Sequence, residues 1–190
     1  WNQNYKIIYQ CNEILDDIEK SENKDDTENI RTKGEALFFR AYCYFNLVRA
    51  FGEVPFIREA YVNGSQQMSV AKSSEKEILA GLVADLEAVE AGNYLPGQYS
   101  STDAAQNKGR ITMWAVKALL ADIYLWQEEY EKCNRKCDEI IGSGQLLLIP
   151  VESRKIEVEN TEAGTTDIYY APDQSSYNSL FRQVYYEGNS

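Results

Sequence analysis

The sequence predicts an all-α fold in which tetratricopeptide-like helical hairpins pack around one buried central helix. Three observations support this prediction: a strongly apolar stretch over residues 34–57, apolar residues at helical spacing in four further segments, and few helix-breaking residues, with 4 Pro and 11 Gly in 190 residues. Apolar positions that recur every three to four residues form a stripe along one side of a helix. A chain of this length can bury one substantial core, so we expect one domain, or one domain with an appended segment.

The stretch 34–57 is predicted to contain the central helix, from Glu35 to Phe51. Apolar side chains occupy almost its whole circumference, so we expect it to be buried on all sides. At a rise of 1.5 Å per residue it would be about 25 Å long, enough to cross a small domain. Gly52 can take the left-handed conformation that ends a helix, and Pro55 prevents the helix from resuming. The apolar positions are Leu37, Phe38, Ala41, Tyr42, Cys43, Tyr44, Phe45, Leu47 and Val48.

A helix over residues 1–20 precedes the central helix, and a charged loop over residues 21–29 is predicted to join the two. Within that loop, Thr27 or Asn29 can cap the start of the central helix. The first helix should direct one stripe of side chains toward the core. This stripe comprises Tyr5, Ile8, Asn12, Leu15 and Ile18.

The third helix follows a mixed connector over residues 58–72, in which Asn63-Gly64 should form a turn. Ser74 and Glu77 have the spacing of a capping box, in which each side chain accepts a hydrogen bond from the other residue's backbone N–H. We expect this helix to end near Gly92.

The fourth and fifth helices should form an antiparallel hairpin. Thr112 is the expected N-cap of the fourth helix, and a connection as short as 127–129 leads into the fifth, from Tyr130 to Ile141. Alanines between large apolar residues in the fourth helix allow close approach of its neighbours. The hairpin resembles tetratricopeptide packing, although Cys133 stands where that repeat usually has Ala.

The helical signal weakens beyond Pro150. We therefore expect a helical domain over residues 1–150 and a loop-rich segment over residues 151–190. Residues 154–166 are polar and are predicted to form a loop. A short amphipathic helix is expected near the end, from the spacing of Tyr177, Leu180, Phe181, Val184 and Tyr185.

The amino-acid composition argues against several kinds of partner and of catalytic or metal site. The formal net charge is −11, from 30 acidic and 19 basic residues, and without a Lys/Arg cluster this argues against nucleic acid or an anionic membrane surface as a direct partner. The sequence has no histidine, which removes imidazole catalysis and His-containing metal sites. The 4 cysteines fit small core residues better than a zinc site, so we expect no metal and no cofactor. No apolar run reaches the length of about 18 residues that would indicate a transmembrane helix.

Four stretches carry a family resemblance. They are Trp1 through Tyr5 to Asn12; Phe38-Phe-Arg-Ala-Tyr through Phe51-Gly-Glu-Val-Pro55; Asp85-Leu86 ahead of Leu95-Pro96; and Ala115 to Leu125 followed by Tyr130. Together they resemble the amino-terminal part of the SusD/RagB family, surface lipoproteins that capture nutrients for a TonB-dependent outer-membrane transporter. The second stretch is the most specific, because the helix length and its terminator both match.

The resemblance implies non-catalytic binding of a glycan, such as an oligosaccharide from starch or another polysaccharide, for delivery to a SusC-like TonB-dependent transporter. It also implies an outer-membrane location, through a lipid-bearing cysteine that would precede Trp1, and a carboxyl-terminal half that lies mostly beyond this sequence. The alternative is a tetratricopeptide-like adaptor that binds a peptide or protein in a groove. An enzyme is the third possibility, since glycoside hydrolysis needs two carboxyls at a fixed separation. The adjacent carboxylates, such as Asp16-Asp17, have the pattern of a solvated face.

Trp1, Asn4 and Tyr5 are the candidate ligand-binding residues. Trp1 and Asn4 stand at positions i and i+3 of the first helix, with Tyr5 adjacent, so they can lie side by side. An aromatic plane against the C–H face of a sugar, beside an amide, is suited to a neutral glycan. The resemblance adds that glycan-binding members of the family use aromatics and amides in this region. The alternative is that Trp1 packs against the core and Asn4 is solvated.

Arg40 is the candidate for a structural ion pair, because it lies in the most apolar helix. A guanidinium stays charged, and an unpaired buried charge costs several kcal/mol, so a carboxylate should face it. Asp85 and Asp122 are the two candidates for this partner. We prefer this structural role for Arg40 to a role in ligand binding.

Overall fold

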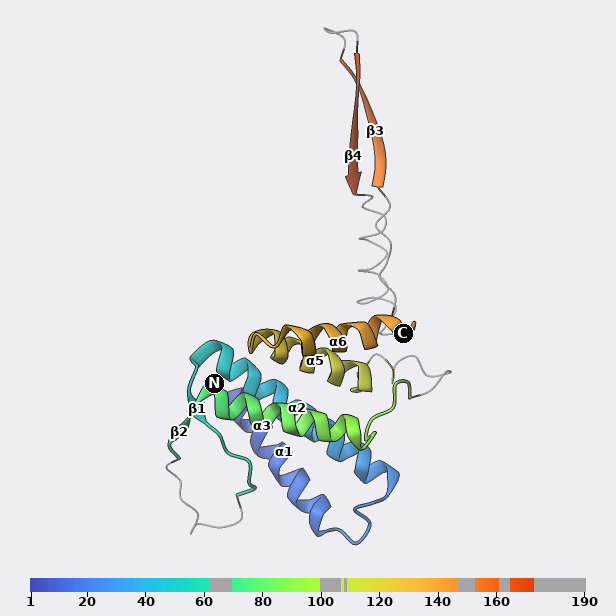
Figure 1. Cartoon of the computed structure of the whole chain (residues 1–190). Helices are drawn as coiled ribbons and strands as arrows, with labels where there is room; N and C mark the ends of the chain where they lie inside the picture. Colours follow the sequence, from blue (N-terminus) through green and yellow to red (C-terminus); the bar gives the residue numbers. More distant parts are fainter. Residues whose placement is uncertain (62–69, 100–106, 108, 147–152, 161–164, 173–190) are drawn as a thin grey trace.

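The computed structural model describes most of the chain and confirms the all-α prediction. It covers residues 1–61, 70–99, 107 and 109–146, together with the backbone of residues 153–160 and 165–172. This part contains five long helices, which Figure 1 labels: α1 (Asn2–Lys20), α2 (Thr27–Phe51), α3 (Glu75–Ala91), α5 (Met113–Trp126) and α6 (Tyr130–Gly142). It also contains four strands: β1 (Val54–Pro55), β2 (Lys72–Ser73), β3 (Ser153–Asn160) and β4 (Thr165–Pro172).

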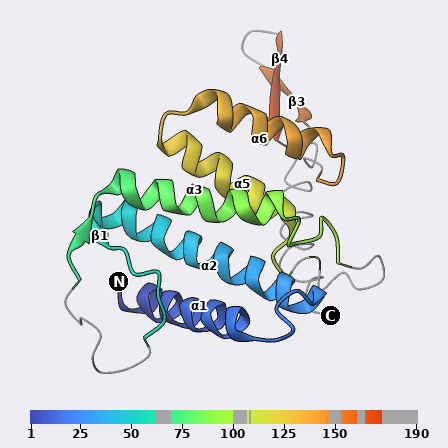
Figure 2. The ribbon, with the colours of Figure 1, turned by 60° about the horizontal axis from the view of Figure 1, so that its bottom comes forward.

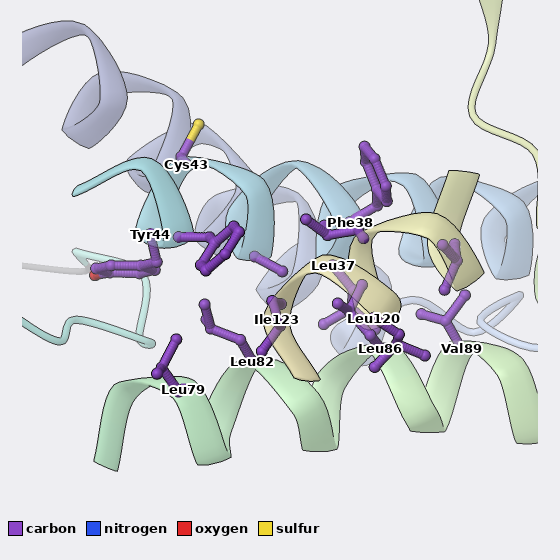
Figure 3. Close-up of a cluster of buried hydrophobic side chains, with 14 of the residues drawn as sticks. Leu37, Phe38, Cys43, Tyr44, Leu79, Leu82, Leu86, Val89, Leu120 and Ile123 are labelled. Carbon is purple, nitrogen blue, oxygen red and sulfur yellow. The ribbon is translucent and has the colours of Figure 1, made fainter. Parts of the chain in front are cut away.

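Helix α2 is the central element of the helical array. Figure 2 shows it between α1 and α3, and it also contacts α5, which pairs with α6 in a hairpin. Its side chains contribute the largest share of the core. Tyr44, Phe45 and Leu47 are fully buried and belong to one core cluster with Leu82 and Leu86 of α3 and Leu120 and Ile123 of α5. Figure 3 shows part of this cluster, including Tyr44, Leu82 and Ile123. Each large apolar side chain buried in this way contributes about 1.5–3 kcal/mol to folding.

Helix α2 begins earlier than the sequence predicted. It starts at Thr27, with Asp26 at the N-cap, and its 25 residues give a length of about 37 Å. The predictions of a loop through residue 29 and of a Thr27 or Asn29 cap were therefore wrong. The first turns of α2 are polar, so they carry little apolar periodicity, but they continue the helix along α1 and include an Arg31–Glu28 ion pair at 3.7 Å.

The end of α2 and the start of α3 are as predicted. Gly52 has a positive φ of 67°, and its backbone N–H donates to the Val48 carbonyl at 2.8 Å. The chain then enters β1, which pairs with β2 in antiparallel register, Val54 opposite Ser73. The cap of α3 is also confirmed, because the Ser74 hydroxyl accepts from the Glu77 backbone N–H at 3.2 Å.

One face of α2 is not buried, contrary to the prediction. The rings of Phe39 and Tyr42 are 43% and 47% exposed. Helices α1, α3 and α5 cover the other sides of α2, and no element in the described part covers this strip. Apolar composition predicted burial here, but burial depends on which neighbours the fold supplies.

The predicted loop over residues 154–166 was also wrong. Strands β3 and β4 pair antiparallel, with Ser153 opposite Pro172 and Asn160 opposite Thr165. In the sequence, Ile156 and Val158 alternate with charged residues, which is the period of a strand. The expected turn at Asn63-Gly64 and the expected helix over residues 177–185 lie outside the described residues, and the domain boundary near residue 150 stays a prediction.

Candidate functional site

Two exposed aromatic rings meet where α1 begins and α2 ends. The ring centroids of Trp1 and Phe51 are 5.0 Å apart, with an interplanar angle of 83°, and each residue is 53% exposed. Phe51 lies at the helix end because Gly52 reverses the chain directly after it. Only the fold brings these two rings together, and they offer an apolar surface to solvent.

Tyr5 lies between Trp1 and the core. Its ring lies 5.2 Å from Trp1 and 6.1 Å from the buried Tyr44, and its hydroxyl donates to the Pro55 carbonyl at 2.8 Å. Burial raises the pKa of Tyr5 to about 12, so the phenol stays neutral and remains a donor at physiological pH. Tyr5 therefore positions Trp1 and the segment after α2.

Asn4 lies one turn from Trp1 on α1 and is partly buried. Within the described residues we find no hydrogen-bond partner for its side-chain amide. The structure thus places Trp1, Asn4 and Tyr5 at one end of the helical array, where the exposed rings are those of Trp1 and Phe51. Their role in ligand binding stays a prediction.

Phe51 was missed by sequence reasoning as a site residue. Its position directly before the helix-ending Gly52 is the signal that could have found it, because a side chain at a helix terminus has fewer neighbours to cover it. Its pairing with Trp1 could not be predicted, since the two residues are far apart in the sequence.

Arg40 pairs with Asp85 and not with Asp122. The Arg40 Nη2 donates to Asp85 Oδ2 at 2.7 Å, and both side chains are buried. Asp85 accepts a second hydrogen bond, from Arg58, on its other oxygen. Asp122 lies instead on the exposed side of α5, 3.5 Å from Arg49. Asp85 pairs with Arg40 because its side of α3 faces the core, whereas Asp122 lies on an exposed side of α5. The spacing of residues in the sequence does not tell which of the two sides is buried.

The Arg40 cluster extends to the segment that follows β1. Arg40 Nη1 donates to Asn12 Oδ1 at 3.0 Å, and the amide of Asn12 donates to the carbonyls of Ile57 and Glu59 at 3.1 and 3.3 Å. The Tyr44 hydroxyl accepts from the Ile57 N–H at 2.7 Å and donates to the Ile57 carbonyl at 2.9 Å. We call these residues, Asn12, Arg40, Tyr44 and Asp85, the buried polar network. It fixes the backbone of residues 57–59 against α1 and α2.

The described residues offer neither a metal centre nor a membrane span. Among them, no three His, Cys, Asp or Glu side chains gather in a way that could hold a metal ion. In the same part of the chain, no helix combines the length and the apolar character needed to cross a membrane.

The family model and the curated relatives that match this chain are all SusD-like. The model of a SusD-like family, described as starch-binding and associating with the outer membrane, matches residues 1–125. A SusD-like protein of Formosa agariphila is 28% identical over 149 residues, which cover 78% of this chain and 27% of the relative. The starch-binding protein SusD of Bacteroides thetaiotaomicron is 30% identical over 145 residues, which cover 74% of this chain and 24% of the relative.

Solved structures agree with these relatives. A laminarin-binding SusD-like protein is 30% identical, with a TM-score of 0.65, over 75% of this chain and 29% of the other. The chain thus spans about a quarter of the length of the curated relatives that it matches. Because the family model covers well over half of the sequence, the chain belongs to the SusD-like family.

Proposed function

We propose that this chain forms the glycan-binding helical part of a surface protein that captures oligosaccharides and delivers them to a SusC-like TonB-dependent transporter. The observation that carries this proposal is the exposed Trp1–Phe51 pair, with Asn4 one helical turn from Trp1 on α1. Membership of a family described as starch-binding and associating with the outer membrane supports it.

The chemistry of this surface favours a neutral sugar. Aromatic faces pack on the C–H faces of a pyranose, and a side-chain amide donates to and accepts from its hydroxyls. A chain with a net charge of −11 repels acidic glycans, so uronic acids and sulfated sugars fit poorly. Starch and laminarin, which relatives of this chain bind, are both neutral polymers of glucose.

The proposed action is binding without bond cleavage. Glycosidases hold two carboxyl groups on either side of the scissile bond. Asp16, one of the adjacent carboxylates considered above, is instead engaged by Lys20 at 2.5 Å on the surface of α1. The proposed location is the outer membrane, reached through a lipid anchor outside this sequence.

Calorimetric titration with maltooligosaccharides and laminarioligosaccharides tests the proposal. Wild-type chain should bind one of the two series, and Trp1→Ala should weaken binding about tenfold or more, because the main stacking ring is lost. Tyr130→Ala is the matched control, since Tyr130 is a similarly exposed aromatic on α6, a helix that packs on α5.

Three results would contradict the proposal. Unchanged affinity in Trp1→Ala, with helicity preserved, would remove the site. Release of reducing sugar from either polymer by the purified chain would show catalysis. Capture of peptides, without any glycan, in a parallel peptide pull-down would favour the tetratricopeptide-like adaptor.

A further inference from the structure

A surface hollow lies on α1, away from the Trp1 end. Its volume is about 600 Å³. Gln10, Glu13, Ile14 and Asp17 line it from α1, and Ala60 and Tyr61 line it from the segment after β1. Volumes of about 300–1,000 Å³ are typical of small-molecule sites.

The walls of this hollow differ in chemistry. Tyr61 and Ile14 are 42% and 40% exposed to solvent, and both present apolar surface. Gln10 and Asp17 add an amide and a carboxylate, whose oxygens accept hydrogen bonds from hydroxyl groups. Asp16, at the same edge, is neutralised by Lys20. An aromatic ring opposite polar acceptors suits a sugar ring, which has apolar C–H faces and a polar rim.

An aromatic stripe along α1 connects the hollow to the Trp1–Phe51 surface. Trp1, Tyr5 and Tyr9 follow one another at intervals of four residues, and the Tyr9 hydroxyl donates to Glu13 at 2.7 Å, where the hollow begins. Since residues at this spacing share a helix face, the stripe runs about 18 Å from Trp1 to Glu13. The hydrogen bond that Tyr9 donates to Glu13 raises the pKa of Tyr9.

The segment after β1 runs beside this stripe. At the end of β1, the Pro55 carbonyl accepts from the Tyr5 hydroxyl. In the segment after it, the carbonyls of Ile57 and Glu59 accept from the Asn12 amide, and Tyr61 lines the hollow. The buried polar network fixes residues 57–59, so the wall that carries Tyr61 is anchored to the same helix as the stripe.

We propose that the hollow between Tyr61 and the Gln10–Asp17 face of α1 is a second sugar subsite, so that the protein binds an extended neutral oligosaccharide along α1. This inference rests on the proposed function and adds the length and course of the ligand. Trp1 and Phe51 hold one end of the oligosaccharide, and Tyr61 holds the other.

The test is the dependence of affinity on ligand length. Maltooligosaccharides and laminarioligosaccharides, from the disaccharide to the heptasaccharide, are titrated into wild type, Tyr61→Ala and Trp1→Ala. Wild-type affinity should rise with length and level off once both subsites are filled. Tyr61→Ala should lose about tenfold in affinity for the heptasaccharide and leave disaccharide binding unchanged. Trp1→Ala should weaken binding at every length.

Tyr130→Ala serves as the control for loss of an exposed tyrosine, and thermal unfolding verifies that each variant is folded. A second variant, Gln10→Ala, removes the amide wall without touching the segment after β1, and it should reproduce part of the loss for long ligands only. Binding that shows the same length dependence in Tyr61→Ala and Gln10→Ala as in wild type would overturn this inference and leave the proposed function intact. Failure of wild type to bind any length would instead contradict the proposed function and this inference with it.

Discussion

The buried polar network and the Trp1–Phe51 surface differ in their burial and in the kind of contact that holds them. The network consists of buried charged and polar groups that hydrogen-bond to one another and to backbone carbonyls. The aromatic pair is half exposed and is held by ring contacts. We propose a division of roles on this basis, in which the network stabilises the scaffold and the exposed rings bind the ligand.

The largest expected effect is that of Asp85→Ala. This change leaves Arg40 as an uncompensated buried charge, and removal of one partner of such a pair costs about 3–5 kcal/mol. The free energy of unfolding, measured by urea denaturation, should fall by this amount. Asp122→Ala is the matched control, and it should cost less than about 1 kcal/mol because its pair with Arg49 is exposed.

Arg40→Met sharpens the same comparison. It removes the buried charge and fills the space with an apolar side chain, so it should cost less than Asp85→Ala. Equal losses in the two variants would contradict a buried pair whose main energetic feature is the cost of an unpaired charge.

Tyr44→Phe should have the next largest effect. The change removes a hydroxyl that serves both the N–H and the carbonyl of Ile57, and an unpaired buried backbone group costs about 1–3 kcal/mol. Protection of the Ile57 amide from hydrogen exchange should fall together with stability. If protection stays at the wild-type level, the segment is held by contacts other than this hydroxyl.

The same tyrosine should make the free energy of unfolding fall at alkaline pH. Burial raises the pKa of Tyr44 above its ordinary value, so the neutral phenol is favoured in the folded state. Its contribution is fully present below the unfolded pKa of about 10 and is lost as pH rises beyond that value. Between neutral and alkaline pH, the free energy of unfolding should therefore fall less steeply in Tyr44→Phe than in wild type.

Gly52→Ala should have a smaller effect, confined to the turn between the two regions. A Cβ here would meet no atom within 4 Å, so the cost comes from the positive φ of 67°, about 1–2 kcal/mol. Glycan affinity should fall modestly, because the turn places Phe51 beside Trp1. A stability equal to that of wild type would show that this turn relaxes without strain.

Much of the scaffold could be predicted from local sequence pattern. Helical periodicity identified α1, and the spacing of Ser74 and Glu77 identified the start of α3. Gly52 was expected to end α2 because glycine tolerates positive φ. These features are local, since each depends on residues within a few positions of one another.

The rest depends on contacts between distant segments. Exposure of Phe39, the choice of Asp85 over Asp122, and the meeting of Trp1 with Phe51 all follow from how the helices are placed in space. The β3–β4 hairpin was missed because its charged residues obscured an alternation that was nevertheless present.

The most direct test of the account combines binding and unfolding measurements on one variant, Trp1→Ala/Phe51→Ala. Removal of both exposed rings should abolish measurable binding of the heptasaccharide that wild type binds, while the free energy of unfolding changes by less than about 1 kcal/mol, as for most surface substitutions. Wild-type affinity in this variant, or a loss of stability as large as that of Asp85→Ala, would contradict the division of roles between the aromatic surface and the buried polar network.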